Sequence, residues 1–475
     1  AYVVLKICYN LFLHPLRSYP GPLLARATLV EYERRTLKGY PHLWLDDLHR
    51  RYGPVVRFSP NLLSFIEPEV WKDVYGHRAS SFHKDIQLFY GPDVYGGAPG
   101  IIRADNNSHA RQRKLVSHAF SDKALKDQES LLKSHVRILT EQLEKIAADG
   151  SVTDMVKWYN FTTFDIMSDL TFGKSLNQLT GSKYSAWVAA VFGFVKAISY
   201  ARIGREWGLT RLLHALLPAD IKAKRQGHIS FAAENVDKRM AQKTERPDIW
   251  TYVMKNCHIE GQELSLNELH SNGATFMLAG TETTATLLSG LTYILTQNPE
   301  KLARLTKEIR GTCKTFEDLT MTNLSQLQYL QACLEEGLRL YPPVPSGLPR
   351  VTPREGATVC GHWVPGGTIV QCPIYSAARS PINFKNPEKF APERYLPEGA
   401  KEYAGDRKEA HQPFSFGPRN CLGQNLAYHE MRLILASVLL HFDLEVGAET
   451  GNWLDQECHF MWAKKPLLVK LTPAH

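Results

Sequence analysis

Long linkers, low-complexity runs and internal repeats are all missing from this sequence of 475 residues. Length alone would allow about three domains. No Ser/Gly-rich stretch divides the chain, however, and apolar segments with helical spacing run almost throughout. We therefore expect a single large domain that is mainly α-helical with a small β region.

Motifs for nucleotide and nucleic-acid binding are absent too. The sequence contains no G-x-G-x-x-G dinucleotide motif and no P-loop, and His429-Glu430 lacks the second histidine of a zinc protease. The net charge of +8 is moderate for this length, and no dense basic stripe with interleaved aromatic residues occurs. We expect no nucleic-acid partner and no nicotinamide or flavin site within the chain.

Cysteines are present, but their spacing shows no pairing. The eight cysteines are scattered along the chain without the regular intervals of a disulfide framework. This distribution favours reduced thiols in a protein that faces the cytosol.

The N-terminal stretch lacks both an initiating methionine and the length to span a bilayer. Residues 1–13 are apolar but are interrupted by Lys6 and Asn10. We interpret them as the remnant of an N-terminal membrane anchor rather than a signal peptide. Residues 14–24 are rich in proline and predict a stiff, extended hinge. The main domain then comprises residues 25–475.

The most informative stretch of the chain reads FSFGPRNCLG. Apolar residues at helical spacing follow Cys421, so its sulfur should lie at the N-terminal end of a helix, where free N–H groups and the helix dipole favour a thiolate. Gly417 permits a turn with positive φ, and Gly423 permits close backbone approach. Phe414 could shield the sulfur, and Arg419 could bind a carboxylate. Together these residue types suit a buried metal thiolate.

The alternative is that Cys421 is simply a buried small hydrophobic residue, the commonest fate of a free cysteine. Five fixed identities within ten residues, as found here, arise by chance in roughly one chain of this length in ten thousand. The stretch resembles the haem-binding signature of the cytochrome P450 monooxygenases, F-x-x-G-x-R-x-C-x-G, with every position filled. The resemblance implies haem b as cofactor, Cys421 as the iron ligand and the cytochrome P450 fold.

A long helix is predicted from Ser265 to Asn298. Ser265 and Glu268 have the spacing of a capping box, and a proline follows Asn298. Midway, residues 279–284 read AGTETT, which is poor helix sequence because glycine and threonine weaken a helix interior. Threonine can also bond backward to a carbonyl. Taken alone, this segment has a purely structural interpretation, in which the glycine allows close packing and the threonine hydroxyls face solvent.

Beside the cysteine motif, AGTETT resembles the family's [AG]-G-x-[DE]-T-[TS] motif. The resemblance implies that Ala279 and Gly280 leave room for dioxygen. It also implies that Glu282 relays protons and that Thr283 hydrogen-bonds the oxygen. The chemistry requires such groups, because splitting the O–O bond needs two protons on one oxygen while the thiolate pushes electron density onto iron.

Glu336 and Arg339 lie on one face of a predicted helix. This spacing alone does not indicate a function, because Glu31 and Arg34 have the same spacing and no expected function. The position of the first pair before the cysteine motif matches the family's E-x-x-R. In the family, an arginine of a P-E-R-[FWY] segment, here Arg394, completes this ion pair. The resemblance implies a structural role in fixing the haem pocket.

Further basic residues are expected at the haem propionates. By charge alone, NNSHARQRKLVSHAF contains an exposed basic turn on a short helix. In the family the corresponding helix carries Trp-x-x-x-Arg, which meets a propionate, and here those positions are His109 and Arg113. By the same resemblance, the segment VPSGLPR should pass beside the haem and bring Arg350 to a propionate. Arg419 of the cysteine motif should also bind a propionate.

The resemblance covers nearly the whole chain and makes residues 25–475 the catalytic domain. It implies that residues 82–105 form a substrate-recognition loop and that residues 184–245 form the roof of the substrate pocket. The stretches YNLFLHPL, HARQRKLVSHAFS and FTTFDIMSDLTFG resemble fungal secondary-metabolite monooxygenases, notably the trichothecene hydroxylase group.

The resemblance predicts an enzyme that oxidises an apolar polyketide, terpenoid or alkaloid with dioxygen and electrons from an NADPH-cytochrome P450 reductase. The N-terminus would bind the endoplasmic reticulum membrane, with the catalytic domain facing the cytosol. The same site could instead end in phenol coupling, ring closure or desaturation. A haem sensor or carrier without turnover is the alternative of a different class, and Glu282 and Thr283 argue against it.

Overall fold

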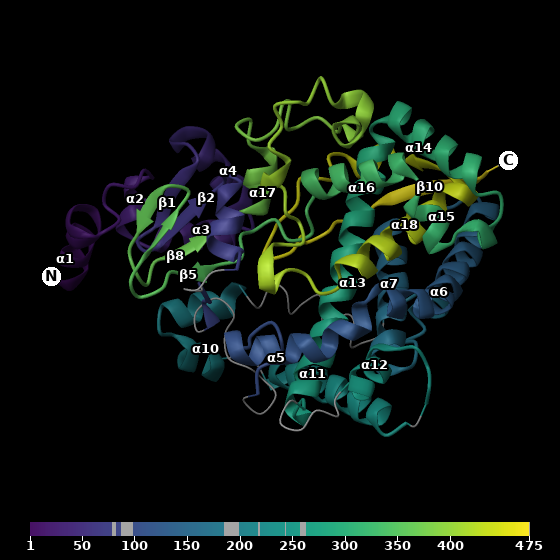
Figure 1. Ribbon diagram of the computed structural model, residues 1–475, viewed down its shortest axis with the longest axis horizontal. Helices are drawn as coiled ribbons and strands as arrows, with labels where there is room; N and C mark the ends of the chain where they lie inside the picture. Colours follow the sequence, from purple (N-terminus) through teal and green to yellow (C-terminus); the bar gives the residue numbers. More distant parts are fainter. Residues whose placement is uncertain are drawn as a thin grey trace.

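The computed structural model describes residues 1–77, 82–86, 98–184, 199–216, 219–242, 244–256 and 263–474. The chain folds into a smaller β-rich part, which contains the N-terminus, and a larger helical part (Figure 1). The predicted substrate-recognition loop and pocket roof lie partly outside the described residues, at 87–97 and 185–198.

The central helix is α13 (Leu266–Thr296), which crosses the helical part of the molecule (Figure 1). The predicted capping box is present, because the Glu268 N–H donates to the Ser265 hydroxyl and the Ser265 N–H donates to the Glu268 carboxylate. The helix ends at Thr296 rather than at the predicted Asn298, because Asn298 is the N-cap of the next helix.

The helix that packs most extensively against α13 is α7 (Met155–Phe172). Every residue of α7 except Lys157 is buried, as expected of a core helix that is covered on all sides. Other helices that contact α13 are α11 (Ala219–Met240), α14 (Pro299–Thr312), α16 (Gln328–Leu340) and α18 (Gln424–His441).

The remaining helices lie around this core (Figure 1). The longest of them, α6 (Asp122–Ala148), packs against α7 and α18. The shorter ones are α5 (Asn106–Val116), α8 (Gln178–Gly181), α10 (Thr210–Leu216), α12 (Ile249–Asn256), α15 (Met321–Ser325) and α17 (Ile374–Arg379).

The largest sheet has five strands in the order β1-β2-β8-β5-β3. They are β1 (Val55–Ser59), β2 (Leu62–Phe65), β3 (His83–Lys84), β5 (Arg350–Val351) and β8 (Ile369–Gln371). The antiparallel β1–β2 hairpin follows from two β-rich runs joined by Pro60-Asn61. Strand β3 pairs with β5 so that Lys84 lies directly opposite Arg350.

Two smaller sheets complete the β structure. The C-terminal tail contributes β9 (Phe442–Val446) and β10 (Leu468–Pro473), and β10 also pairs with β4 (Val152–Asp154) beside the start of α7. The other sheet is a hairpin of β6 (Ala357–Val359) and β7 (His362–Val364).

The N-terminal segment projects from the β-rich part as α1 (Tyr2–Cys8) and the following turn Tyr9–Leu13 (Figure 1). The helices α2 (Leu23–Ala27), α3 (Val30–Leu37) and α4 (Pro41–Tyr52) follow the proline-rich stretch. The buried guanidinium of Arg57 in β1 holds both the turn Tyr9–Leu13 and the proline-rich stretch by donating to the carbonyls of Asn10 at 3.0 Å and Leu16 at 3.4 Å.

The fold agrees with the predicted class, a single mainly α-helical domain with a small β region. Cysteines within the described ranges form no disulfide bond. Over the same ranges, no helix combines the length and the apolar character that crossing a membrane requires.

Candidate active site

Cys421 lies in a tight loop between the short turn Gly417–Arg419 and α18. Its N–H donates to the Phe414 carbonyl at 2.8 Å, which closes the loop. Gly417 has a φ of +73°, as predicted, and a Cβ at this position would lie 2.0 Å from the Tyr75 carbonyl oxygen. Only glycine fits this turn, because any side chain would be both strained and in collision.

The Cys421 side chain retains exposed surface although protein atoms surround the loop. Burial raises the pKa of the Cys421 thiol, whereas the Gly423 N–H and the positive charge of Arg113 oppose this change. The Gly423 N–H at the helix end lowers the thiol pKa as predicted, but desolvation of the sulfur outweighs this effect and that of Arg113. Metal coordination deprotonates a thiol outright, so the sulfur still suits an iron ligand.

Two other residues of the cysteine motif make ordinary contacts. The Phe414 ring packs against Tyr428 with ring centroids 5.0 Å apart, and shielding of the sulfur by Phe414 stays a prediction. A Cβ on Gly423 would lie 3.9 Å from the Phe120 ring, so the close backbone approach predicted there is not found among the protein atoms. Gly423 instead contributes its N–H to the sulfur.

All four residues predicted to bind propionates converge in one basic cluster. His109 is buried on α5, and burial is the main reason that its pKa falls to about 3. Four cations lie close enough to lower this pKa further: Arg419, Lys84, Arg113 and Arg350. Lys84 escaped the sequence analysis because β3 is only two residues long and lies in a stretch that has no clear periodicity.

The register of β3 and β5 concentrates positive charge in this cluster. Like charges directly opposite each other destabilise an antiparallel pair, and Lys84 faces Arg350 in this way. Burial, together with the charges of Arg350 and Arg419, holds the pKa of Lys84 well below its usual value. Buried charges require opposite charges nearby. The two propionates of haem b would supply them, so the residues present fit this cofactor.

Two arginines join the cluster to the cysteine loop. Arg113 of α5 donates to the backbone and side-chain oxygens of Asn420, at 2.8 and 2.5 Å. Arg419 donates to the Ala104 carbonyl at 2.8 Å and to the Asn106 side chain at 2.9 Å. These bonds hold the start of α5 against the loop that carries Cys421. Asn420 had no role in the sequence analysis, since the motif leaves its position variable.

The AGTETT segment stays helical within α13 and shows the predicted backward bonds. The Thr283 hydroxyl donates to the Ala279 carbonyl at 2.6 Å, four residues earlier. Ala279 is exposed and Thr283 is half-buried, so this face of the central helix is open. A Cβ on Gly280 would lie 2.6 Å from the sulfur of Met167 on α7. Gly280 thus has the packing role left open above, and its role beside dioxygen stays a prediction.

Glu282 lies on a different side of α13, where it is buried. Its carboxylate forms an ion pair with Lys464 of the C-terminal segment. Lys464 also donates to the Thr286 hydroxyl at 2.8 Å, one turn along the helix from Glu282. The sequence offered no signal for this pair, because the two residues are 182 positions apart.

The predicted E-x-x-R network is present and fully buried. Arg339 donates to both carboxylate oxygens of Glu336, at 2.7 and 2.8 Å, and Arg394 donates to Glu336 at 3.1 Å. Arg394 also pairs with Asp406 at 2.7 Å. Arg339 donates to three further carbonyls between residues 378 and 389. The network therefore ties α16 to the irregular chain that leads to the cysteine loop.

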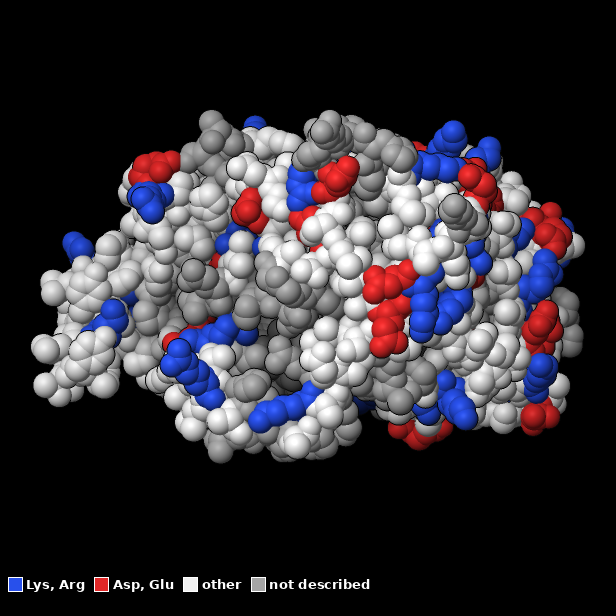
Figure 2. Space-filling model, turned by 90° about the horizontal axis from the view of Figure 1, so that it is seen from below, with Lys and Arg blue, Asp and Glu red and all other residues white. Residues whose placement is uncertain are grey.

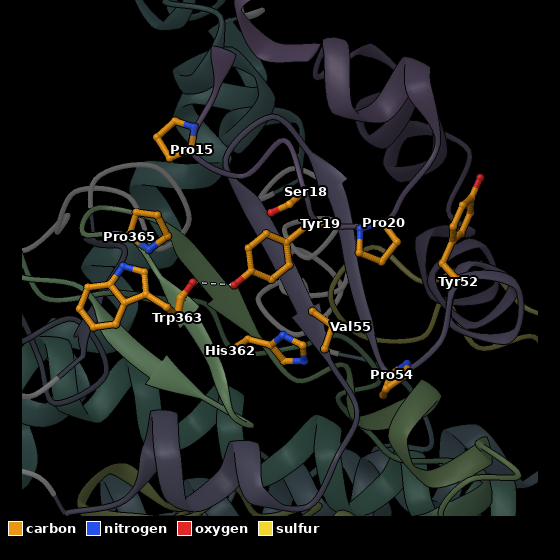
Figure 3. A pocket seen from close by; sticks show the side chains of 10 residues that line it. All are labelled: Pro15, Ser18, Tyr19, Pro20, Tyr52, Pro54, Val55, His362, Trp363 and Pro365. Atoms are coloured by element: carbon orange, nitrogen blue, oxygen red, sulfur yellow. Dashed lines mark hydrogen bonds between the residues drawn. The ribbon is translucent and has the colours of Figure 1, made fainter. Parts of the chain in front are cut away.

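A separate pocket of about 600 Å³ lies near the N-terminus (Figure 3). Pro15 and Pro20 of the proline-rich stretch form one side, and His362 and Trp363 of β7 form the other. The Tyr19 hydroxyl joins the two sides by donating to the Trp363 carbonyl at 2.7 Å. None of the predicted site residues lines this pocket, so it is distinct from the candidate active site.

Comparison with known proteins agrees with this geometry. The model of the cytochrome P450 family matches residues 18–471. The cytochrome P450 monooxygenase efuB of Hormonema carpetanum is 45% identical, over 100% of this chain and 94% of the relative. The cytochrome P450 monooxygenase FUM2 of Gibberella moniliformis is 44% identical, over 98% of this chain and 99% of the relative. Averantin hydroxylase of Dothistroma septosporum is 41% identical, over 98% and 88% respectively. The chain belongs to the cytochrome P450 family and is a haem b monooxygenase similar to those of fungal secondary metabolism.

Proposed function

We propose that this monooxygenase inserts one atom of dioxygen into a C–H bond of an apolar small molecule. The second oxygen atom leaves as water after it takes up two protons and two electrons, and the electrons come from NADPH through a separate reductase. One observation above all supports the proposal. The cysteine loop is bonded to α5, which carries part of the basic cluster, and α18, which follows this loop, packs against α13.

Cys421 would bind the haem iron, and the propionates would be held by His109, Arg113, Arg350 and Arg419, with Lys84 as a further cation. Haem, when bound, supplies the redox chemistry that activates dioxygen. The bonds that join α5 to the cysteine loop would help to hold the cofactor in place. The E-x-x-R network would stabilise the chain that leads to this loop.

Glu282 and Thr283 would manage protons on the α13 side. The Thr283 hydroxyl now bonds the Ala279 carbonyl, and it lies on the open face where a hydrogen bond to dioxygen could form. Glu282 is its neighbour in sequence and lies in a buried ion pair, so it can connect this face with the protein interior. Such positioned proton donors typically accelerate a reaction by about 10²–10⁴-fold.

The substrate is proposed to be an apolar polyketide, terpenoid or alkaloid. Support comes from the fungal relatives, one of which is by name a hydroxylase of averantin. Averantin is therefore a reasonable first probe, followed by a panel of polyketides and terpenoids. Binding would be detected as a spin-state shift in the haem spectrum.

We also infer that the N-terminus binds the endoplasmic reticulum membrane and that the catalytic domain faces the cytosol. The α1 residues Tyr2, Val3, Val4 and Leu5 are between 62% and 78% exposed. Residues 1–30 contain no Asp or Glu, and in Figure 2 the tip of this projection, at the left, carries blue side chains among white ones. Apolar and basic side chains together favour an anionic lipid surface. Removal of residues 1–24 should then abolish sedimentation with phosphatidylserine-containing vesicles.

The proposed reaction is tested with purified holoenzyme, a fungal reductase and NADPH under ¹⁸O₂. Hydroxylation predicts substrate-dependent NADPH consumption and one ¹⁸O atom in the product. Product without ¹⁸O would instead indicate coupling, ring closure or desaturation. A protein that shows spin-state shifts but never consumes NADPH in response to any bound compound would be a sensor or carrier, and the proposal would fall.

A further inference from the structure

A buried lysine from the C-terminal segment faces the acid of α13. The ammonium of Lys464 contacts Glu282 Oε1 and donates to the Thr286 hydroxyl at 2.8 Å. The side chains of Lys464 and Glu282 keep only 3% and 6% of their exposed surface. Desolvation of two charges is costly and often exceeds the gain from pairing them. A pair at this depth therefore calls for a function beyond stability.

The two oxygens of the Glu282 carboxylate have different surroundings. Oε1 takes part in the ion pair, whereas Oε2 is buried and has no hydrogen-bond partner in the part of the chain that the structure describes. Buried polar atoms almost always have a partner. Oε2 is thus an acceptor that the protein leaves available. Because successive residues lie about 100° apart around a helix, Glu282 faces the C-terminal segment while Thr283 faces the open side of α13.

The segment that carries Lys464 is held firmly on both sides. The Trp462 indole donates to the Pro342 carbonyl at 2.8 Å and stacks on Tyr341, with ring centroids 4.7 Å apart. On the other side, the Trp453 indole donates to the Lys465 carbonyl at 2.9 Å. The Lys464 ammonium therefore has a defined position, unlike that of a lysine on the surface.

We propose that Lys464 is a positioning residue for proton delivery to the active site. Its ammonium fixes Glu282 Oε1, keeps the carboxylate ionised, and leaves Oε2 as the one oxygen that accepts a proton and passes it on. Oε2 takes up each proton from solvent and releases it toward the active site, so the Glu282 carboxylate is ionised again after each transfer. The inference rests on the proposed role of Glu282.

Among the residues that the structure describes, Lys464 is the one cation in an ion pair with Glu282. The phenols of Tyr184 and Tyr341 also lie close enough to feel the charge of Glu282. Burial raises the pKa of both phenols, so both are neutral at working pH. A Lys464→Met variant would leave the carboxylate buried without a cation, and such a group takes up a proton. A carboxylic acid that already holds its proton cannot accept the next one.

The protonation state is tested directly by infrared spectroscopy on the holoenzyme. We expect the Lys464→Met variant to gain a C=O band of a protonated carboxylic acid that the wild type lacks. The Lys464→Met/Glu282→Gln double variant should lose this band again, which assigns it to Glu282. A protonated Glu282 in the wild type, or an ionised one in Lys464→Met, would overturn the proposal. This result does not depend on turnover.

The kinetic test uses reductase, NADPH and the best substrate from the spectral screen. Lys464→Met should slow product formation about tenfold or more, raise the solvent isotope effect and divert electrons to peroxide. Lys464→Arg should restore most of the coupling. Lys465→Met is the matched control, because the neighbouring Lys465 side chain lies at the surface and donates to the Asp455 carbonyl. It should behave as the wild type.

The double variant distinguishes positioning from a merely structural effect. If Lys464 acts through Glu282, Lys464→Met/Glu282→Gln should be no slower than Glu282→Gln alone. Additive losses, or identical behaviour of Lys464→Met and Lys465→Met, would contradict the inference. A haem spectrum like that of the wild type checks that each variant is folded. A wild type that shows no turnover would refute the proposed function instead, and the infrared result would still decide the role of Lys464.

Discussion

Each side of the active site contains a buried glutamate, and the two glutamates differ in how many of their carboxylate oxygens have hydrogen-bond partners. On the cysteine side, Glu336 Oε1 accepts bonds from Arg339, Arg394 and the Ala391 N–H, and Oε2 accepts another from Arg339. On the α13 side, Glu282 has one oxygen in an ion pair and the other without a partner in the described structure. A fully satisfied carboxylate fixes the chain around it, whereas a half-satisfied one can still exchange a proton.

A substitution that breaks the cysteine side should have the largest effect. Arg339→Ala removes two bonds to the buried Glu336 carboxylate and leaves Arg394 as its one remaining arginine, which should cost about 3–5 kcal/mol of unfolding free energy. The chain that leads to the cysteine loop should loosen as well, so the protein should contain little haem. Denaturant unfolding and haem content per polypeptide measure both effects. Normal haem content in this variant would remove the assigned structural role.

A substitution on the α13 side should change the reaction rather than the fold. Thr283→Ala removes a hydroxyl from the open face of α13, so haem content and substrate binding should be preserved. Electrons should be lost as peroxide, and the yield of product per NADPH should fall about tenfold or more. Unchanged coupling of NADPH to product would count against the proposed role of Thr283 in the reaction.

The basic cluster offers a test in which two effects have opposite signs. Lys84→Met removes the like charge that faces Arg350, so the protein without haem should become more stable by up to about 1 kcal/mol. The same variant should bind haem more weakly, because one partner of the propionates is lost. Thermal unfolding of the apoprotein and haem transfer to apomyoglobin measure the two effects. Stability and haem retention that fall together would argue for a purely structural lysine.

The smallest effect is expected for the glutamate–arginine pair that shares the E-x-x-R spacing at the surface. Arg34 donates to both oxygens of Glu31, at 2.7 and 2.9 Å, but the Arg34 side chain is 45% exposed. Water screens such pairs, and long side chains lose entropy to form them. Arg34→Ala should therefore leave Tm and haem content unchanged, which makes it the matched control for Arg339→Ala. A large loss of haem here would show that burial does not separate the two pairs.

Features that depend on neighbouring residues could be predicted from the sequence. Local patterns predicted the capping box of α13 and the positive φ of Gly417, because each depends on residues a few positions apart. The family resemblance assigned His109, Arg113, Arg350 and Arg419 to one place, and the structure brings them together.

What the sequence missed depends on contacts between distant residues or on burial. Lys84 joins the basic cluster only through the register of a two-residue strand with β5. Lys464 reaches Glu282 only because the C-terminal tail folds back onto α13. The balance at Cys421 is of the same kind, since the sequence indicated both a helix end and a buried sulfur but not which effect on the thiol pKa is larger.

The account depends most on Cys421 as the iron ligand. The most direct measurement is the absorption difference spectrum of the dithionite-reduced holoenzyme with and without carbon monoxide, for the wild type and for Cys421→His. We expect the wild type to show the long-wavelength Soret band of a cysteine-thiolate haem and the variant to lose it. A wild-type band at the position of a histidine-ligated haem would contradict the account.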